Sequence, residues 1–256
     1  MIKFFRKFRQ SMIQENKVIK YVLYAVGEIV LVVIGILIAL NINNNNEANK
    51  TRDTELRYLG NIKNDLNLTI NSLDDYMGRR TEQIAAANTV LDHHNGRPIS
   101  NFVEFNMQCI SIYIWQRFNL SDNTFQELVN SGNLALISND SIKNLLLNLE
   151  SKYKEMKDGE DHFRYDTENL LYKSVYAKLD MDPTVRNFYY QVTQGQQGED
   201  VPLNKELFSG ILNSLEHKNG MVMAVAEFGN MLMRFGEMKA MALELIQLID
   251  QEQASD

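Results

Sequence analysis

The residue whose chemistry is least expected in its surroundings is Glu28, a carboxylate inside the otherwise apolar stretch of residues 21–40. A charged group within the hydrocarbon core of a bilayer costs at least a few kcal/mol, so it normally faces protein or water and is protonated or paired. Gly27, Gly35 and Ala39 accompany Glu28 at helical spacing, and Gly35-x-x-x-Ala39 is a small-xxx-small pattern that lets a second helix approach closely. These four residues therefore predict a helix–helix interface.

Two other roles for Glu28 stay open at this stage. Its side chain could extend toward Lys20 or the lipid head groups, which would require no partner helix. It could also take part in a proton relay, although the sequence shows no second relay group inside the span.

The histidines and the single cysteine do not form a recognisable site. His93 and His94 are adjacent and would point in different directions on a helix, while His162 and His217 are isolated, a pattern typical of surface or turn histidines. Cys109 is the only cysteine, which excludes an internal disulfide and a multi-cysteine zinc site, and we expect it to be buried.

No motif of a known catalytic site is present. Ser131-Gly132-Asn133 lacks the surroundings of a nucleophile elbow, and the sequence has no P-loop, HExxH or GxGxxG pattern. We therefore predict a protein that is not an enzyme, with no catalytic residue, no cofactor and no metal site.

The element that positions Glu28 is the apolar stretch itself, residues 21–40, whose twenty positions span about 30 Å as a helix, the thickness of the bilayer core. Residues 1–20 carry six basic groups and one acidic group, whereas residues 41–256 carry 20 basic and 31 acidic groups. The positive-inside rule then places the N-terminus in the cytoplasm and exports the acidic part. A cleaved signal peptide is the competing interpretation, but the apolar run is long, starts late and lacks a small-x-small cleavage site. We predict an uncleaved signal-anchor.

Residues 1–20 have the pattern of a helix lying on the inner membrane surface. Aromatic residues fall on one side and cations on the other, as in helices that bind anionic lipids. The residues predicted to contact the membrane surface are Lys3, Phe4, Phe5, Arg6, Lys7, Phe8 and Arg9. A basic tail without fixed structure would satisfy the insertion rule equally well.

Helical periodicity dominates the remainder, residues 41–256. A seam of three- and four-residue steps predicts one long helix ending at the turn 95–98, and its members are Leu59, Ile62, Leu66, Ile70, Leu73, Met77, Arg80, Ile84, Ala87 and Leu91. Residues 99–118 could be a buried helix or a strand, and their length favours a helix. Thr124 to Glu127 resembles a capping box that starts a short helix ending at Gly132. A second long helix, a loop over 183–203 and a final helix from His217 follow. The predicted fold is all-α: one transmembrane helix, then an elongated helical bundle with long coiled-coil-like helices.

Three runs of residues carry a resemblance to a known family: FFRK, YAVGEIVLVVIGILIALNINN and NTFQELVNSGNLALISNDSI. They are similar to an uncharacterised family of single-span membrane proteins common in Bacteroidota, a domain of unknown function. Asn45 stands where that family usually has a Trp, so one aromatic anchor at the interface is missing. The resemblance implies a Gram-negative inner membrane with the large domain in the periplasm, and it brings no catalytic residues.

The leading hypothesis is a membrane-anchored, non-enzymatic interaction or scaffold protein that oligomerises through its transmembrane and membrane-proximal helices. Its expected partners are the lipid bilayer and a second copy of the chain or another membrane protein. The alternative is a periplasmic helical bundle that senses a ligand and works with a separate signalling or transport partner. Because the exported domain is acidic, nucleic acid is not an expected partner.

Overall fold

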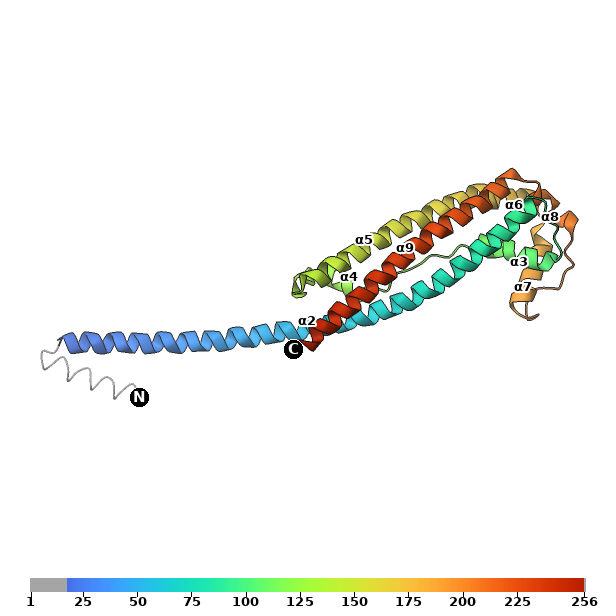
Figure 1. The fold of residues 1–256 in the computed structure, drawn as a ribbon. Helices are drawn as coiled ribbons and strands as arrows, with labels where there is room; N and C mark the ends of the chain where they lie inside the picture. Colours follow the sequence, from blue (N-terminus) through green and yellow to red (C-terminus); the bar gives the residue numbers. More distant parts are fainter. Residues whose placement is uncertain (1–17, 256) are drawn as a thin grey trace. The chain divides into compact units, whose positions relative to one another are not determined.

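The computed structural model describes residues 18–255, which fold into helices and turns without any strand (Figure 1). The predicted all-α fold is confirmed. The elements are α2 (Val18–His94), α3 (Phe102–Tyr113), α4 (Asn123–Asn130), the 3-10 helix η1 (Asn133–Leu136), α5 (Asp140–Asp166), the π-helix η2 (Thr167–Tyr172), α6 (Lys173–Lys178), α7 (Met181–Val192), α8 (Lys205–Leu212) and α9 (Leu215–Ala254). The chain divides into two compact units, Met1–Arg57 and Tyr58–Asp256, and each is described by itself.

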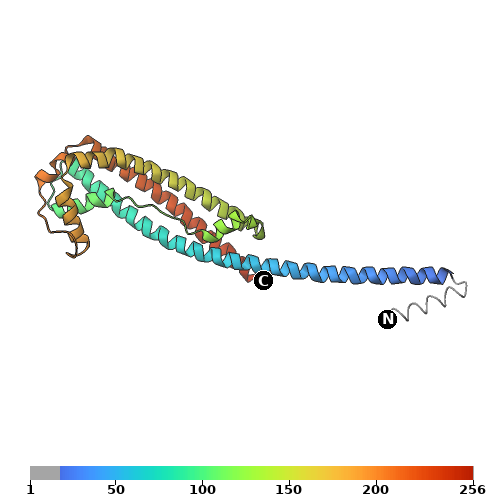
Figure 2. The same cartoon turned by 180° about the vertical axis from the view of Figure 1, so that it is seen from behind.

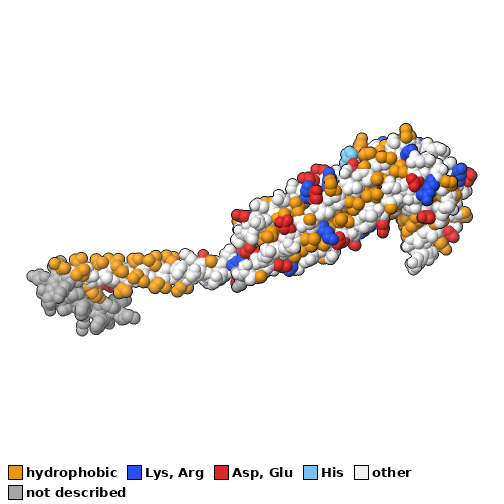
Figure 3. Space-filling view, in the orientation of Figure 1, with side chains coloured by type: hydrophobic (Ala, Val, Ile, Leu, Met, Phe, Trp, Pro, Cys, Tyr) orange, Lys and Arg blue, Asp and Glu red, His pale blue; other side chains and the backbone are white. Residues whose placement is uncertain are grey.

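The first unit contains the apolar part of α2. This helix is long and apolar enough to cross a membrane, and none of its most apolar window is buried. Figure 3 shows hydrophobic side chains covering the visible face of this part of the helix. Glu28 is the one acidic residue within residues 22–40. The composition and exposure of this stretch agree with the predicted span.

The second unit is built on three long helices: the part of α2 from Tyr58 onward, α5 and α9 (Figures 1 and 2). Lys63 Nζ lies 2.5 Å from Asp250 Oδ1, and Lys239 Nζ lies 2.5 Å from Asp74 Oδ1. The chain advances along α2 while it returns along α9, so these two helices are antiparallel. A bond of 3.1 Å between Lys152 on α5 and Glu237 on α9 belongs to a second antiparallel pairing.

The buried side of α2 differs from the predicted seam at particular positions. Leu59, Ile62, Leu66, Leu73 and Ala87 are buried as expected. At three other positions the predicted residue is only half-buried: Ile70, Ile84 and Leu91. The residue before each of them is buried instead, namely Thr69, Gln83 and Val90. A strict seven-residue repeat explains this register, and the polar members are accepted because neighbouring segments offer them hydrogen bonds.

Residues 99–118 are only partly helical, since α3 ends at Tyr113 and residues 114–121 run extended between α2 and α5. Side chains of both helices satisfy the backbone of this extended segment. Tyr76 donates to the carbonyl of Arg117 at 2.6 Å, and Glu160 accepts from the backbone N–H of Phe118 at 2.8 Å. We call residues 114–121 the strap.

The predicted loop over residues 183–203 is wrong in its first half, where α7 (Met181–Val192) is a regular helix. Asp180 caps this helix by accepting a hydrogen bond from the Asp182 N–H, and Pro183 lies in its first turn, where no backbone donor is needed. The remaining residues turn back on α7, because Arg186 pairs with Glu199 at 2.6 Å.

The predicted capping box is also wrong. The N-cap of α4 is Asp122, without a side-chain cap bond, and Asp65 of α2 accepts from the Thr124 N–H at 2.9 Å. A carboxylate on another helix thus replaces the local cap. Gly132 does end this segment as expected, with a φ of 74°.

Candidate functional site

The predicted interface residues lie on the exposed part of α2 in the first unit. Gly27, Gly35 and Ala39 are exposed, and Glu28 is half-buried. A Cβ placed on Gly27 or Gly35 would meet no described atom within 4 Å. Tyr24, Gly27, Glu28, Leu31 and Val32 line one hollow beside the helix. Among residues 18–255, nothing packs against Gly27 or Gly35, which is what the small-residue pattern requires of a face that a second helix approaches.

The predicted membrane-surface residues, Lys3, Phe4, Phe5, Arg6, Lys7, Phe8 and Arg9, lie outside the described residues.

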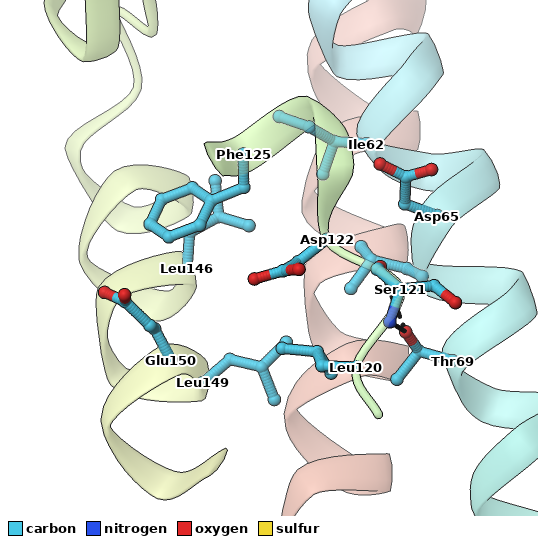
Figure 4. Close-up of a pocket in the computed structure, with 11 residues that line it drawn as sticks. Ile62, Asp65, Thr69, Leu120, Ser121, Asp122, Phe125, Leu146, Leu149 and Glu150 are labelled. Atoms are coloured by element: carbon cyan, nitrogen blue, oxygen red, sulfur yellow. Dashed lines mark hydrogen bonds between the residues drawn. The ribbon is translucent and has the colours of Figure 1, made fainter. Parts of the chain in front are cut away.

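A small pocket lies between α2, the strap, α4 and α5 in the second unit (Figure 4). Its volume of about 20 Å³ is little more than that of one water molecule. Thr69 exchanges two hydrogen bonds of 3.2 Å with the backbone of Ser121 at its wall. Burial raises the pKa of Asp122, and a bond of 2.8 Å from Gln126 opposes that shift. This space is too small for an organic ligand, so we interpret it as a gap in the packing of the core.

A buried polar cluster joins α2, the strap and α5. Arg80 is only 2% exposed, and it donates to Gln83 Oε1 at 2.7 Å and to the carbonyl of Gln116 at 3.0 Å. Its guanidinium group also lies 4.7 Å from the centroid of the Phe228 ring on α9. Glu160, fully buried, binds Lys157 at 3.1 Å as well as the strap. These groups are engaged in holding the helices and the strap together.

A chain of hydrogen-bonded side chains crosses the end of the bundle where α2 ends and α9 begins. His94 Nε2 lies 2.8 Å from His217 Nδ1, and His217 Nε2 lies 2.5 Å from the Tyr113 hydroxyl. His94 Nδ1 lies 3.0 Å from the carbonyl oxygen of Leu212. Since a carbonyl only accepts, His94 donates from Nδ1; burial lowers the pKa of His94, and the neutral ring accepts at Nε2. His217 then donates from Nδ1 and accepts from Tyr113, which is the arrangement in which every member is neutral.

Burial explains why the chain stays neutral. His217 is 0% exposed, and burial followed by the nearby His94 and Lys178 lowers its pKa to about 3. Burial likewise raises the pKa of Tyr113 well above its usual value and that of Cys109 to about 12. Cys109 therefore stays a thiol, which is a poor nucleophile, and its predicted burial is confirmed.

The interpretation of His217 as an isolated surface or turn histidine is wrong. It is separated from His94 by 123 residues, so no local spacing reveals the pair. The available signal was that His94 ends one long predicted helix and His217 begins another, and antiparallel helices bring such ends together. His162 is exposed as expected and lies 3.5 Å from Glu227.

A larger hollow adjoins this histidine chain. Its volume is about 430 Å³. The residues that line it come from the end of α2, the turn after it, α3 and α8: His93, His94, Gly96, Arg97, Pro98, Ile99, Phe102, Lys205, Ser209, Leu212 and Asn213. We call it the end hollow. Within residues 18–255, no three His, Cys, Asp or Glu side chains are arranged to hold a metal ion.

Comparison with known proteins adds a family. A family of unknown function, DUF6090, matches residues 28–172, more than half of the chain. The chain belongs to this family. The DUF6090 match starts at Glu28 and ends at Tyr172, the last residue of η2, so α6, α7, α8 and α9 lie outside it. No curated protein and no solved structure matches the chain.

Proposed function

We propose that this DUF6090 protein is a membrane-anchored, non-enzymatic interaction protein that associates with a second copy of itself through the Glu28 face of α2. The observation that carries the proposal is that no atom of residues 18–255 packs against Gly27 or Gly35, on a helix apolar enough to span a bilayer. In lipid, helices associate by close backbone packing at small residues and by polar contacts across the interface. The Glu28 face, which consists of Gly27, Glu28, Gly35 and Ala39, has small residues for close packing and a carboxyl group for a polar contact.

The absence of enzymatic activity is part of the proposal. Three buried polar residues of the second unit have structural partners: Arg80 binds Gln83 and the strap, Glu160 binds the strap and Lys157, and His217 binds Tyr113. Side chains held by such partners make the bundle rigid and are not free to act on a substrate. A partner other than a second copy would be found by affinity purification from native membranes.

We further propose that the N-terminus is cytoplasmic and that the helical bundle lies in the periplasm, anchored in the inner membrane. The basic residues 1–20 and the acidic remainder support this orientation. The native Cys109 is buried, so a cysteine introduced at the exposed Gln196 would dominate labelling. Labelling of Gln196→Cys by an impermeant maleimide in intact spheroplasts supports the orientation, and labelling only after lysis contradicts it.

Self-association is tested by crosslinking in native membranes and by oligomer size in nanodiscs. Gly35→Leu fills the open space beside the helix, and Glu28→Leu removes the polar contact, so both should reduce the crosslinked species. Val33→Leu is a matched control, because it adds a methylene on the opposite side of the helix. If Gly35→Leu and Glu28→Leu leave the oligomer unchanged, the interface is wrongly assigned.

A further inference from the structure

The end hollow has the size of a ligand site and a lining of one charge sign. Small-molecule sites typically measure 300–1,000 Å³, and this hollow measures about 430 Å³. Its described lining includes the cations Arg97 and Lys205 and no carboxylate. That composition is unusual in this chain, because residues 41–256 hold 31 acidic and 20 basic groups. The hollow is therefore a local cationic site on an acidic protein.

The turn that carries Arg97 is fixed from several sides. His93 Nδ1 donates to the Arg97 carbonyl at 2.9 Å, and the Arg97 N–H donates to the Asp92 carbonyl at 3.0 Å. Lys218 on α9 also binds the Asn95 side chain of this turn at 2.7 Å. The guanidinium group itself remains 63% exposed and pairs with Asp92 at 3.2 Å. A fixed backbone with a reachable cation is suited to binding an anion.

The other wall of the end hollow is apolar and rigid. Pro98, Ile99, Phe102 and Leu212 supply it. The Phe102 ring stacks on Phe208 with 6.0 Å between centroids and 4° between planes. A ligand of matching chemistry would have an apolar body next to its negative group.

His94 lines the end hollow but does not join Arg97 and Lys205 in binding an anion. Both of its ring nitrogens are already engaged, with the Leu212 carbonyl and with His217. In its neutral form it has no donor left for an anion. Its ring is a fixed reporter at the edge of the hollow.

From these contacts we infer that the end hollow binds a small organic carboxylate, with the carboxylate on Arg97 and Lys205 and the apolar body against Phe102, Ile99 and Leu212. This inference goes beyond self-association and does not depend on it, because it concerns residues of the second unit alone. It also gives the ligand-sensing alternative a specific site.

The test uses hexanoate as the probe and hexanamide as its uncharged isostere, on the full chain in nanodiscs. The chain has only four histidines, so ¹³Cε1-histidine labelling gives four ring signals. Hexanoate should shift the His93 and His94 signals saturably and leave His162 on α5 unmoved. Eight non-hydrogen atoms at the low end of ligand efficiency correspond to a Kd of about 20 mM. Hexanamide should bind about tenfold more weakly, since it lacks the charge-assisted bonds.

The decisive variant is Arg97→Gln with Lys205→Gln, which should weaken hexanoate binding about tenfold or more. Lys154→Gln with Arg164→Gln removes the same two charges from the exposed side of α5 and should leave the affinity unchanged. Unchanged affinity in the first double variant overturns the inference. Equal binding of hexanamide, displacement of hexanoate by inorganic phosphate at lower concentration, or no shift of His93 and His94 overturns it as well.

Discussion

His94 and His217 are joined by a hydrogen bond of 2.8 Å between Nε2 and Nδ1, and this bond connects the last residue of α2 to the start of α9. The two histidines are the middle members of the hydrogen-bonded series that runs from the Leu212 carbonyl to the Tyr113 hydroxyl. Its stability depends on both rings being neutral, which makes the bundle sensitive to acid.

We expect the bundle to lose stability as the pH falls below 6.5. Burial lowers the pKa of His217 to about 3, whereas the unfolded residue titrates near 6.5. Between these values the unfolded state binds a proton that the folded state does not. Stability from this group is thus full above pH 6.5 and falls by about 1.4 kcal/mol per pH unit, or about 2 kcal/mol at pH 5.

Urea unfolding of the detergent-solubilised protein, followed by the fluorescence of the single Trp115, measures this dependence. Trp115 is half-buried and stacks on the buried Phe163, with 6.0 Å between ring centroids. His217→Asn should be less stable at pH 7 but should show a shallower loss between pH 6.5 and 5. An equal slope in the variant would contradict the assignment to His217.

Arg80 and Arg79 make a matched pair on α2. Arg80→Ala removes the donor to Gln83 Oε1 and to the Gln116 carbonyl, so we expect a loss of about 3 kcal/mol in the free energy of unfolding. Arg79 makes an exposed bond of 2.9 Å to Gln116, and Arg79→Ala should cost less than about 1 kcal/mol. Equal losses would show that the buried cluster is not important for stability.

The Thr69 hydroxyl group is predicted to matter more than its methyl group. Thr69→Val keeps the shape but leaves the N–H and carbonyl of Ser121 unpaired beside the small pocket (Figure 4), at a cost of about 2 kcal/mol. Thr69→Ser keeps both bonds and loses one buried methyl, at about 1 kcal/mol. The same urea titration ranks the two variants, and the opposite ranking would refute a bonding role for the hydroxyl.

Two glycines of α9 should respond in opposite directions to alanine. A Cβ on Gly220 would overlap the side chain of Leu171 in η2, which is fully buried, so Gly220→Ala should destabilise by about 1–3 kcal/mol. Gly229 is exposed and has open space, so Gly229→Ala should stabilise by up to about 1 kcal/mol through helix propensity. Thermal unfolding followed by circular dichroism distinguishes the two variants. An unchanged melting temperature in Gly220→Ala would show that Leu171 of η2 can move to make room for the added methyl group.

The sequence was most informative where local physics decides the outcome. The apolar stretch with Glu28, the helical period and the stop at Gly132 each depend on neighbouring residues, and the structure agrees with all three. Local rules failed where a distant group replaced a local one. Asp65 took over the cap of α4, and the strap left the helical state because Tyr76 and Glu160 satisfy its backbone.

The candidate sites divide in the same way. Which residues share a side of α2 with Glu28 follows from the sequence, because a single helix determines it; that this side is an interface stays a prediction. The His94–His217 pair was not predictable, because antiparallel packing of α2 and α9 brings together residues 123 positions apart. The end hollow was not predictable either, because α8 contributes to its wall beside the end of α2. The sequence alone determined the all-α class, the apolar stretch and the row of small residues beside Glu28. Only the tertiary structure decided which polar residues are buried, because burial of Thr69, Arg80 and His217 depends on hydrogen-bond partners from other elements.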